Sequence, residues 1–212
     1  MLDSLVKPEN DKNEEGKKER SGMFKDLVMK NRTYRRHYQN ERIPEETVRE
    51  LIDLTRYVAS SSNRQPLKYV FSCDPEKNAR IFPLIGFAAQ LKDWGGPIDG
   101  ERPAAYIFVL LDTDIAKAAG CDHGIAAQTI LLGATERGLG GCMHGTVKRP
   151  EVMQLFNIPA KYEILLAISL GKPKEKVVIE PLPPDGKTVY WRTPDQVHHV
   201  PKRALEDIII SS

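Results

Sequence analysis

The chain of 212 residues is long enough for one domain with a sizeable core, or for one protomer of an intertwined oligomer. Hydrophobic residues make up 41% and charged residues 28%, which is ordinary for a globular protein. A formal net charge of +2 is too small to indicate binding to nucleic acid or to an anionic membrane surface. The partners of the chain must therefore be inferred from local sites.

Two further features indicate the cellular setting. The longest apolar runs are shorter than the roughly 20 residues that a membrane-spanning helix needs, and the first residues lack the apolar core of a signal peptide. Three cysteines (Cys73, Cys121 and Cys142) are too few, and odd in number, for a disulfide framework. The sequence predicts a cytoplasmic protein with no membrane partner.

The N-terminal residues 1–20 alternate lysines with acidic residues and carry almost no large apolar side chains. Such a segment buries too little surface to offset its ordering entropy, so it is expected to be a disordered charged tail. Residues 21–212 are expected to form a single domain.

Helices and strands follow in an irregular order. "IPEETVRELIDLTRYV" predicts a helix with Val48, Leu51 and Ile52 on one face, and residues 76–92 predict a second helix, bent or restarted at Pro83. "RPAAYIFVLLD" and "YEILLAISLG" have the character of central strands, and "CDHGIAAQTILLGATERGLGG" that of a buried helix. Because strands and helices do not alternate regularly as in βαβ units, the pattern favours an α+β fold with helices around a mixed sheet.

A basic motif, "NRTYRRHY", places Arg32, Arg35 and the hydroxyl of Thr33 on adjacent turns. The planar donors of arginine match phosphate oxygens, and a threonine hydroxyl adds a neutral hydrogen bond. The alternative is a solvated basic helix end. The residues alone leave both interpretations open.

A serine-rich corner, "ASSSNRQP", separates a helical pattern from a strand. Ser60, Ser61, Asn63 and Gln65 offer hydrogen bonds to a polar ring edge or a polyol chain. The same residue types also cap helices and make turns, so a well-capped corner is the alternative.

The segment "GLGGCMHG" is not a dinucleotide-binding loop, because Met143 stands where G-x-G-x-x-G needs glycine and because the segment leaves a helix to enter a strand. Its glycines favour either a close approach of backbone to a flat ligand or the end of the helix.

No metal site is predicted. Cys121 and His123 at a helix start would not converge with Cys142 and His144 on a strand, so buried cysteines beside hydrogen-bonded histidines are expected instead. A zinc-binding interaction domain remains a competing hypothesis. Nothing in the sequence specifically supports a hydrolase triad.

Near the C-terminus, "VHHVPKR" ends in Lys202 and Arg203. These two residues belong either to a basic surface strand or to a phosphate site shared with Arg32 and Arg35. The apolar end "ALEDIII" is expected to be buried against another surface, and another subunit is one candidate for that surface.

Four segments in this order resemble the FMN-dependent nitroreductase family: "NRTYRRHY", "IPEETVRELIDLTRYVASSSNRQPLKYVF", "CDHGIAAQTILLGATERGLGGCMHG" and "FNIPAKYEILLAISLGKP". The family shows an Arg-Ser-x-Arg start, a Pro-Ser-x-x-Asn-x-Gln-Pro corner and Asp-x-Gly-x-Ala-x-Gln on a buried helix. The resemblance runs from about Phe24 to Ile210. It implies a three-layer αβα fold with a mixed central sheet, in an intertwined homodimer with FMN at the subunit interface.

The resemblance also implies which residues bind FMN. In it the serine-rich corner meets the ribityl chain and ring, and the basic motif holds the phosphate or the pyrimidine edge. The C-terminal pair closes on the phosphate, and a backbone turn places donors near the flavin N5. These residues are Arg32, Thr33, Arg35, Ser60, Ser61, Asn63, Gln65, His144, Gly145, Lys202 and Arg203. Three positions depart from the family pattern: Thr33 keeps the hydroxyl of the usual Ser, whereas Ala59 for Pro and Leu67 for Trp change the packing around the ring.

In function, the resemblance implies an NAD(P)H oxidoreductase that reduces a small organic acceptor, such as a nitroaromatic or a quinone, by ping-pong hydride transfer. Arg35 would stabilise the anionic reduced flavin. No acid–base side chain is needed, so no catalytic residue is assigned, and Trp94 and His144 are pocket candidates only. The alternative hypothesis is a flavin-binding protein for storage or sensing that performs no turnover.

Overall fold

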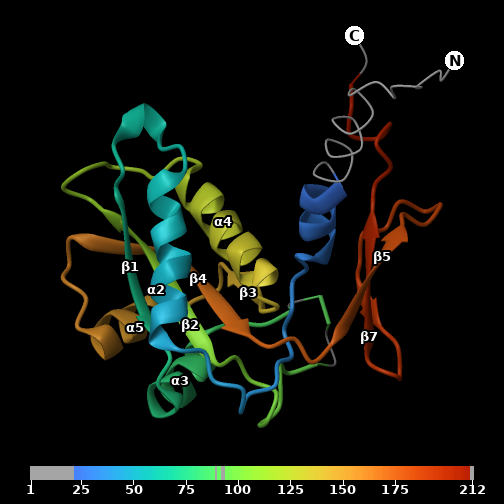
Figure 1. The fold of residues 1–212 in the computed structure, drawn as a ribbon, viewed down its shortest axis with the longest axis horizontal. Helices are drawn as coiled ribbons and strands as arrows, with labels where there is room; N and C mark the ends of the chain where they lie inside the picture. Colours follow the sequence, from blue (N-terminus) through green and yellow to red (C-terminus); the bar gives the residue numbers. More distant parts are fainter. Residues whose placement is uncertain (1–21, 89, 92–93, 211–212) are drawn as a thin grey trace, which may run out of the picture.

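The computed structural model describes residues 22–88, 90–91 and 94–210 (Figure 1). The charged tail expected at residues 1–20 lies outside the described residues.

The centre of the fold is a four-stranded sheet. Its strands, in spatial order, are β1 (Leu67–Ser72), β2 (Ala105–Asp112), β4 (Tyr162–Gly171) and β3 (Gly140–His144). Every residue of β2 is buried, which confirms the predicted central strand. All neighbouring strands within this sheet are antiparallel, and parallel pairing enters at the edge of β3, where Thr33 bridges Gly141.

Helices cover both faces of this sheet. The helices α2 (Glu45–Asp53) and α4 (Asp122–Glu136) pack on one face, and α3 (Pro75–Ile81) and α5 (Arg149–Phe156) on the other (Figure 1). Because alternate side chains of a strand point to opposite faces, β2 serves both: Ile107 lies in the core with α2 and α4, and Phe108 in the core with α3 and α5. The three-layer αβα arrangement is therefore confirmed.

The helix predicted for residues 76–92 is much shorter than expected. The helix α3 ends at Ile81, a single 3₁₀ turn covers Phe82–Leu84, and Ile85 then forms an extended bridge with Val147. Pro83 explains the end, since a proline ring removes a backbone donor and clashes with the preceding turn. The prediction of a restarted helix is wrong for the described part of this segment.

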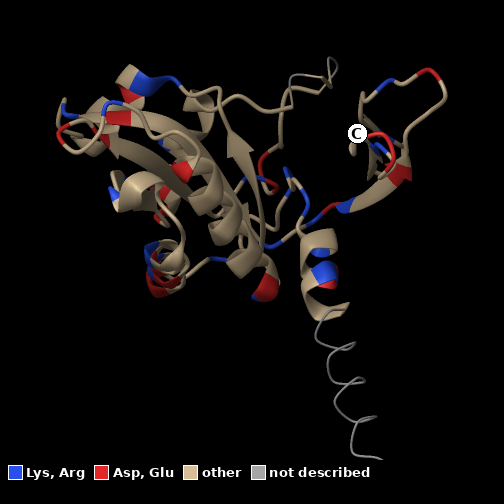
Figure 2. Cartoon of the chain, turned by 90° about the horizontal axis from the view of Figure 1, so that it is seen from above, with Lys and Arg blue, Asp and Glu red and all other residues tan. Residues whose placement is uncertain are grey.

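A second, three-stranded sheet lies beyond the helical residues 22–30. Its order is β5 (Lys176–Pro181), β7 (Val197–Lys202) and β6 (Trp191–Arg192), with β5 parallel to β7. Figures 1 and 2 show it standing away from the main sheet in two perpendicular views.

The fully buried Glu175 carboxylate ties this sheet to the body of the fold. It accepts hydrogen bonds from the backbone N–H of Arg35 (2.5 Å) and of Arg36 (3.2 Å), and from the Arg192 guanidinium (2.7 Å). Arg192 lies on β6 and Arg35 in the basic motif, so one buried anion joins the two regions.

In the part of the chain that the structure describes, no helix combines the length and the apolar character needed to cross a bilayer.

Candidate functional site

A cavity of about 400 Å³ lies between the basic motif, α4 and the second sheet. We call it the basic pocket. Its polar lining includes Arg32, Thr33, Arg35, Gln128, Tyr190, His198 and Lys202.

The basic motif is fixed in an extended conformation along the edge of β3. Thr33 bridges Gly141, and the Tyr34 N–H donates to the Gly141 carbonyl at 2.9 Å. Residues two apart on an extended chain point the same way, so Thr33 and Arg35 both line the pocket. The interpretation of this motif as a solvated helix end does not hold for Arg35, which is only 9% exposed.

The Arg35 guanidinium lies between two rings. Its Nη1 is 3.2 Å from His198 Nε2, and its Cζ is 4.9 Å from the centre of the Tyr190 ring. Since arginine only donates, His198 Nε2 must accept, which leaves the proton on Nδ1. Burial, reinforced by the charge of Arg35, lowers the pKa of His198 from 6.5 to about 4, so this ring is neutral near pH 7.

Several buried donors around this pocket have no acceptor among the described residues: Nε of Arg32, Nε of Arg35 and Nδ1 of His198. Buried polar groups in proteins almost always have a partner. This unsatisfied, cationic donor set fits phosphate oxygens or the oxygen-bearing edge of a heterocycle.

The serine-rich corner is held by a residue that the sequence analysis did not select. Asp122, buried at the start of α4, accepts from Ser60 Oγ at 2.6 Å and from the Ser61 N–H at 3.0 Å. Ser60 Oγ in turn accepts from the Gln65 N–H at 2.9 Å. The Ser60 hydroxyl therefore ties the corner to α4, and its contact with a ligand stays a prediction.

The rest of the corner is open. Ser61, Asn63 and Gln65 are exposed, and the Gln65 amide donates to Asn63 Oδ1 at 3.1 Å. The corner lines a second cavity of about 230 Å³, the corner pocket, together with Ala59 and Leu67. The two departures from the family pattern thus lie beside the predicted ligand-binding groups.

The two pockets lie apart within one chain, and no described residue lines both. On α4, Asp122 lines the corner pocket and Gln128 the basic pocket. At a rise of 1.5 Å per residue they stand about 9 Å apart along the helix axis. Within one protomer, the predicted Ser60–Gln65 group and the group of Arg32, Thr33 and Arg35 thus line different pockets.

The remaining predicted residues are distributed unevenly. Lys202 lines the basic pocket, whereas Arg203 is exposed and lines neither pocket. The Trp94 ring lies 4.5 Å from the Arg192 guanidinium and borders a different cavity. Gly145 is exposed, with free space where a side chain would begin.

The side chain of His144 belongs to the core. Its Nδ1 donates to the Gly86 carbonyl at 3.0 Å, so its Nε2 accepts from Ser169 Oγ at 2.8 Å. Burial lowers the pKa of His144 to about 4. The ring lines neither the basic nor the corner pocket, which leaves only its backbone for the predicted contact near the flavin N5.

Three of the four glycines of "GLGGCMHG" serve the end of a helix or the packing of the protein. Gly138 has φ +70° just beyond α4, a left-handed conformation that favours glycine. A side chain at Gly140 would collide with the Tyr34 ring, and one at Gly141 with the Ser169 carbonyl. Gly138 thus fits the helix-end interpretation, and the close approach of backbone to a flat ligand stays a prediction.

Among the described residues, no group of three or more His, Cys, Asp or Glu side chains is placed to hold a metal ion. The thiol of Cys142 is buried, which raises its pKa to about 11.

Comparisons with known proteins add to this geometry. The model of the nitroreductase family matches residues 28–96 and 100–172, which is more than half of the chain. A Methanothermobacter thermautotrophicus protein with the provisional name NADH dehydrogenase/NAD(P)H nitroreductase is 27% identical over 178 residues, covering 81% of this chain and 84% of its own. A Cr(VI) reductase from Pseudomonas sp. strain G-1 is 26% identical, covering 75% and 70%.

A solved structure has a similar fold. The NADPH:FMN oxidoreductase from Vibrio harveyi, complexed with NAD⁺, superposes with a TM-score of 0.58 at 22% identity, over 76% of this chain and 73% of that one.

Proposed function

Because this chain belongs to the nitroreductase family and is an oxidoreductase, we propose that it is an FMN-dependent enzyme. In this proposal NADH or NADPH is the electron donor and a small organic molecule, such as a nitroaromatic or a quinone, is the acceptor. Donor and acceptor occupy one site in turn, which gives ping-pong kinetics. Residues 21–212 are proposed to form the single flavin-binding domain.

One observation carries the proposal: the basic pocket presents buried donors that have no acceptor among the described residues. The phosphate of FMN and the oxygens of its pyrimidine ring are acceptors of the kind that this set lacks. When bound, FMN supplies the two-electron chemistry, and the protein supplies binding, orientation and electrostatics.

Within the proposed site, the chain's own groups have separate tasks. Arg32 and Thr33 bind the phosphate or the pyrimidine edge, and Lys202 and Arg203 approach the phosphate from the end of β7. Arg35 holds positive charge next to the ring, where it stabilises a reduced anionic flavin. Its own position is set by His198, Tyr190 and the backbone bond to Glu175.

The corner pocket completes this site from a second copy of the chain. Ser61, Asn63 and Gln65 offer donors and acceptors to the ribityl chain and ring, and Ser60 shapes the turn that presents them. The backbone at His144 and Gly145 contributes donors near N5. A homodimer with FMN at the interface is supported by the separation of the two pockets in one protomer.

Exposed apolar side chains at both ends of the described chain also support a homodimer. Met23 and Phe24 are 72% and 64% exposed, and Leu205, Ile208 and Ile210 are 60%, 64% and 97% exposed. A second protomer that covers them would remove this surface from water.

An anaerobic absorbance experiment tests the proposal. The purified chain, incubated with FMN and freed of excess, should show flavin bands that bleach with NADH or NADPH and return when a nitroaromatic or a quinone is added. Bands that persist with both nucleotides would contradict an NAD(P)H oxidoreductase and favour a flavin-binding protein for storage or sensing. A chain that retains no flavin would contradict the cofactor assignment.

A further inference from the structure

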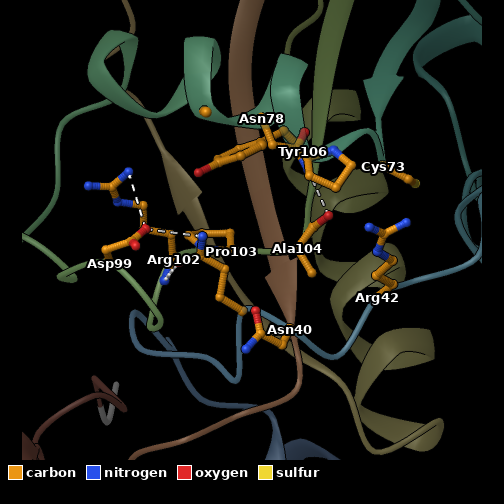
Figure 3. A pocket seen from close by; sticks show the side chains of 12 residues that line it. Asn40, Arg42, Cys73, Asn78, Asp99, Arg102, Pro103, Ala104 and Tyr106 are labelled. Carbon is orange, nitrogen blue, oxygen red and sulfur yellow. Dashed lines mark hydrogen bonds and ion pairs between the residues drawn. The ribbon is translucent and has the colours of Figure 1, made fainter.

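A third cavity, of about 360 Å³, lies away from the proposed flavin site. It is enclosed by the segment around Gln39–Arg42, the start of α3 and the segment that leads into β2, and we call it the α3 pocket (Figure 3). None of its lining residues lines the basic or the corner pocket. Its volume is within the range of small-molecule sites.

Two buried polar atoms at this pocket have no partner among the described residues. They are the hydroxyl of Tyr106, a fully buried residue of β2, and Oδ1 of Asn78, a residue of α3 that is 7% exposed. The Asn78 amide donates to the Ala104 carbonyl at 2.7 Å, a contact drawn in Figure 3. That bond identifies Oδ1 as the free acceptor.

Burial strongly raises the pKa of Tyr106, so its hydroxyl keeps its proton and is able to donate. The inner part of the pocket therefore offers one unused donor and one unused acceptor. A ligand hydroxyl, which both accepts and donates, matches this pair.

The mouth of the pocket is cationic. Arg102 stacks 4.5 Å from the Phe82 ring, and its Nε is buried without a partner among the described residues. Arg42 is exposed and makes no ion pair or side-chain hydrogen bond with any described residue. Asp99 is the one acidic residue of the lining, and it is 3.7 Å from Arg102 and 3.3 Å from the Gln39 amide.

Two guanidinium groups against one carboxylate leave the mouth with a net positive charge. Planar guanidinium donors match carboxylates well. We propose that the α3 pocket binds a small hydroxydicarboxylate, with one carboxylate at Arg42, the other at Arg102 on the opposite side of the pocket (Figure 3), and its hydroxyl at Tyr106 and Asn78. This site is separate from the proposed flavin site and does not depend on the function assigned there.

Isothermal titration calorimetry on the full chain, at constant ionic strength, tests the proposal with malate and succinate, which differ by one hydroxyl. Malate should bind saturably at one site per chain and about tenfold more tightly than succinate, because succinate leaves the buried pair unsatisfied. Absence of saturable malate binding would mean a solvent-filled cavity and would overturn the proposal.

Three variants locate the binding. Tyr106→Phe removes only the unpartnered hydroxyl, so the protein should fold with unchanged or higher thermal stability and lose its preference for malate. Arg42→Gln should weaken both ligands by a similar factor. Arg80→Gln, an exposed change on α3 outside the pocket lining, should weaken neither.

Two results would overturn the assignment even if malate binds. The first is a malate preference that survives Tyr106→Phe. The second is a loss in Arg80→Gln as large as that in Arg42→Gln, since binding would then follow the general surface charge.

Discussion

His144, the last residue of β3, is a buried histidine whose two ring nitrogens both have hydrogen-bond partners. His144 donates to the Gly86 carbonyl and accepts from Ser169, and its ring packs edge-on against Phe87 at 4.7 Å. Protonation would turn the accepting nitrogen into a second donor facing the Ser169 hydroxyl. The Ser169 hydroxyl can rotate to accept that bond, so burial is what keeps the ring neutral near pH 7, and the Gly86 carbonyl fixes its proton on Nδ1.

This protonation state makes stability depend on pH. The folded pKa of His144, about 4, lies below its ordinary value of 6.5 because of burial, so the unfolded chain binds the proton more readily. The stability that depends on a neutral His144 is fully present above pH 6.5 and is lost as the pH falls toward 4. At pH 5 the stability lost through His144 amounts to about 2 kcal/mol.

Urea unfolding at several pH values checks this expectation. His144→Gln, which keeps a donor and an acceptor, should be less stable than the parent at pH 7.5 and should lose less stability between pH 6.5 and 5. Burial also lowers the pKa of His37 to about 4, so His37 adds to the pH dependence of stability in both the parent and the variant. If His144→Gln lost as much stability between pH 6.5 and 5 as the parent does, His144 would not be a source of the pH dependence.

Arg35 is the residue on which the electrostatics of the proposed flavin site depend most. Arg35→Ala should weaken FMN binding by about 10- to 100-fold, the usual range for a charge-assisted hydrogen bond, and should lower the flavin reduction potential. Fluorescence titration and spectroelectrochemistry measure the two effects. Arg49→Ala, in an exposed pair with Glu45, is the matched control and should change neither. Unchanged FMN affinity and potential in Arg35→Ala would refute its role.

At the scale of elements, the start of α4 positions the serine-rich corner. A buried carboxylate there receives two hydrogen bonds from the corner, and three corner residues, Ser62, Asn63 and Gln65, have φ of 51–52°. Non-glycine residues avoid this region unless the surroundings hold them there. Asp122 supplies part of that constraint.

Asp122→Ala should therefore lower the free energy of unfolding by about 1–3 kcal/mol, because the Ser61 N–H and the Ser60 hydroxyl lose their acceptor. It should also weaken FMN binding, since the corner is no longer held. Asp53→Ala removes a carboxylate that pairs with Arg56 at the surface and should change stability by less than about 0.5 kcal/mol. Equal effects of the two substitutions would contradict the role of Asp122.

Local sequence patterns predicted the elements better than the contacts between them. The apolar runs of β2 and β4 and the buried helix α4 were predictable, because burial on both faces leaves a continuous apolar sequence. The early end of α3 was not, since a proline permits either a kink or a stop and the bridge from Ile85 to Val147 decides between them.

The candidate site was predictable to the same degree. The Arg32–Arg35 motif and the Ser60–Gln65 corner were found from residue type and resemblance. Asp122 and Gln128 stood in a quoted motif without an assigned role. His198 and Glu175 act through partners more than a hundred positions away along the chain, and no local pattern carries such pairings.

At the scale of the whole molecule, the second sheet and the C-terminal end extend from a core that is otherwise covered on both faces (Figures 1 and 2). This extension carries His198 and Lys202 of the basic pocket, followed by the exposed residues 205–210. A projecting sheet that is followed by exposed apolar side chains is suited to contact with a second protomer.

Ile208→Asp should therefore weaken the proposed dimer and reduce FMN content together, because a charge in an apolar interface is costly. Analytical ultracentrifugation and flavin absorbance measure the two effects. Glu206→Ala, an exposed change in the same segment, should leave both unchanged. A variant Ile208→Asp that remains dimeric with full flavin content would show that this end of the chain is not part of the interface.

The most direct test of the central claim, a flavin site built from two copies of the chain, is FMN binding by mixed dimers of Arg35→Ala and Asp122→Ala. Each variant alone is expected to bind FMN poorly. If the site combines the basic pocket of one protomer with the corner pocket of its partner, each mixed dimer regains one intact site, and tight FMN binding returns. If both pockets act within one chain, every site in the mixed dimer keeps a defect, and the absence of any recovery would contradict the account.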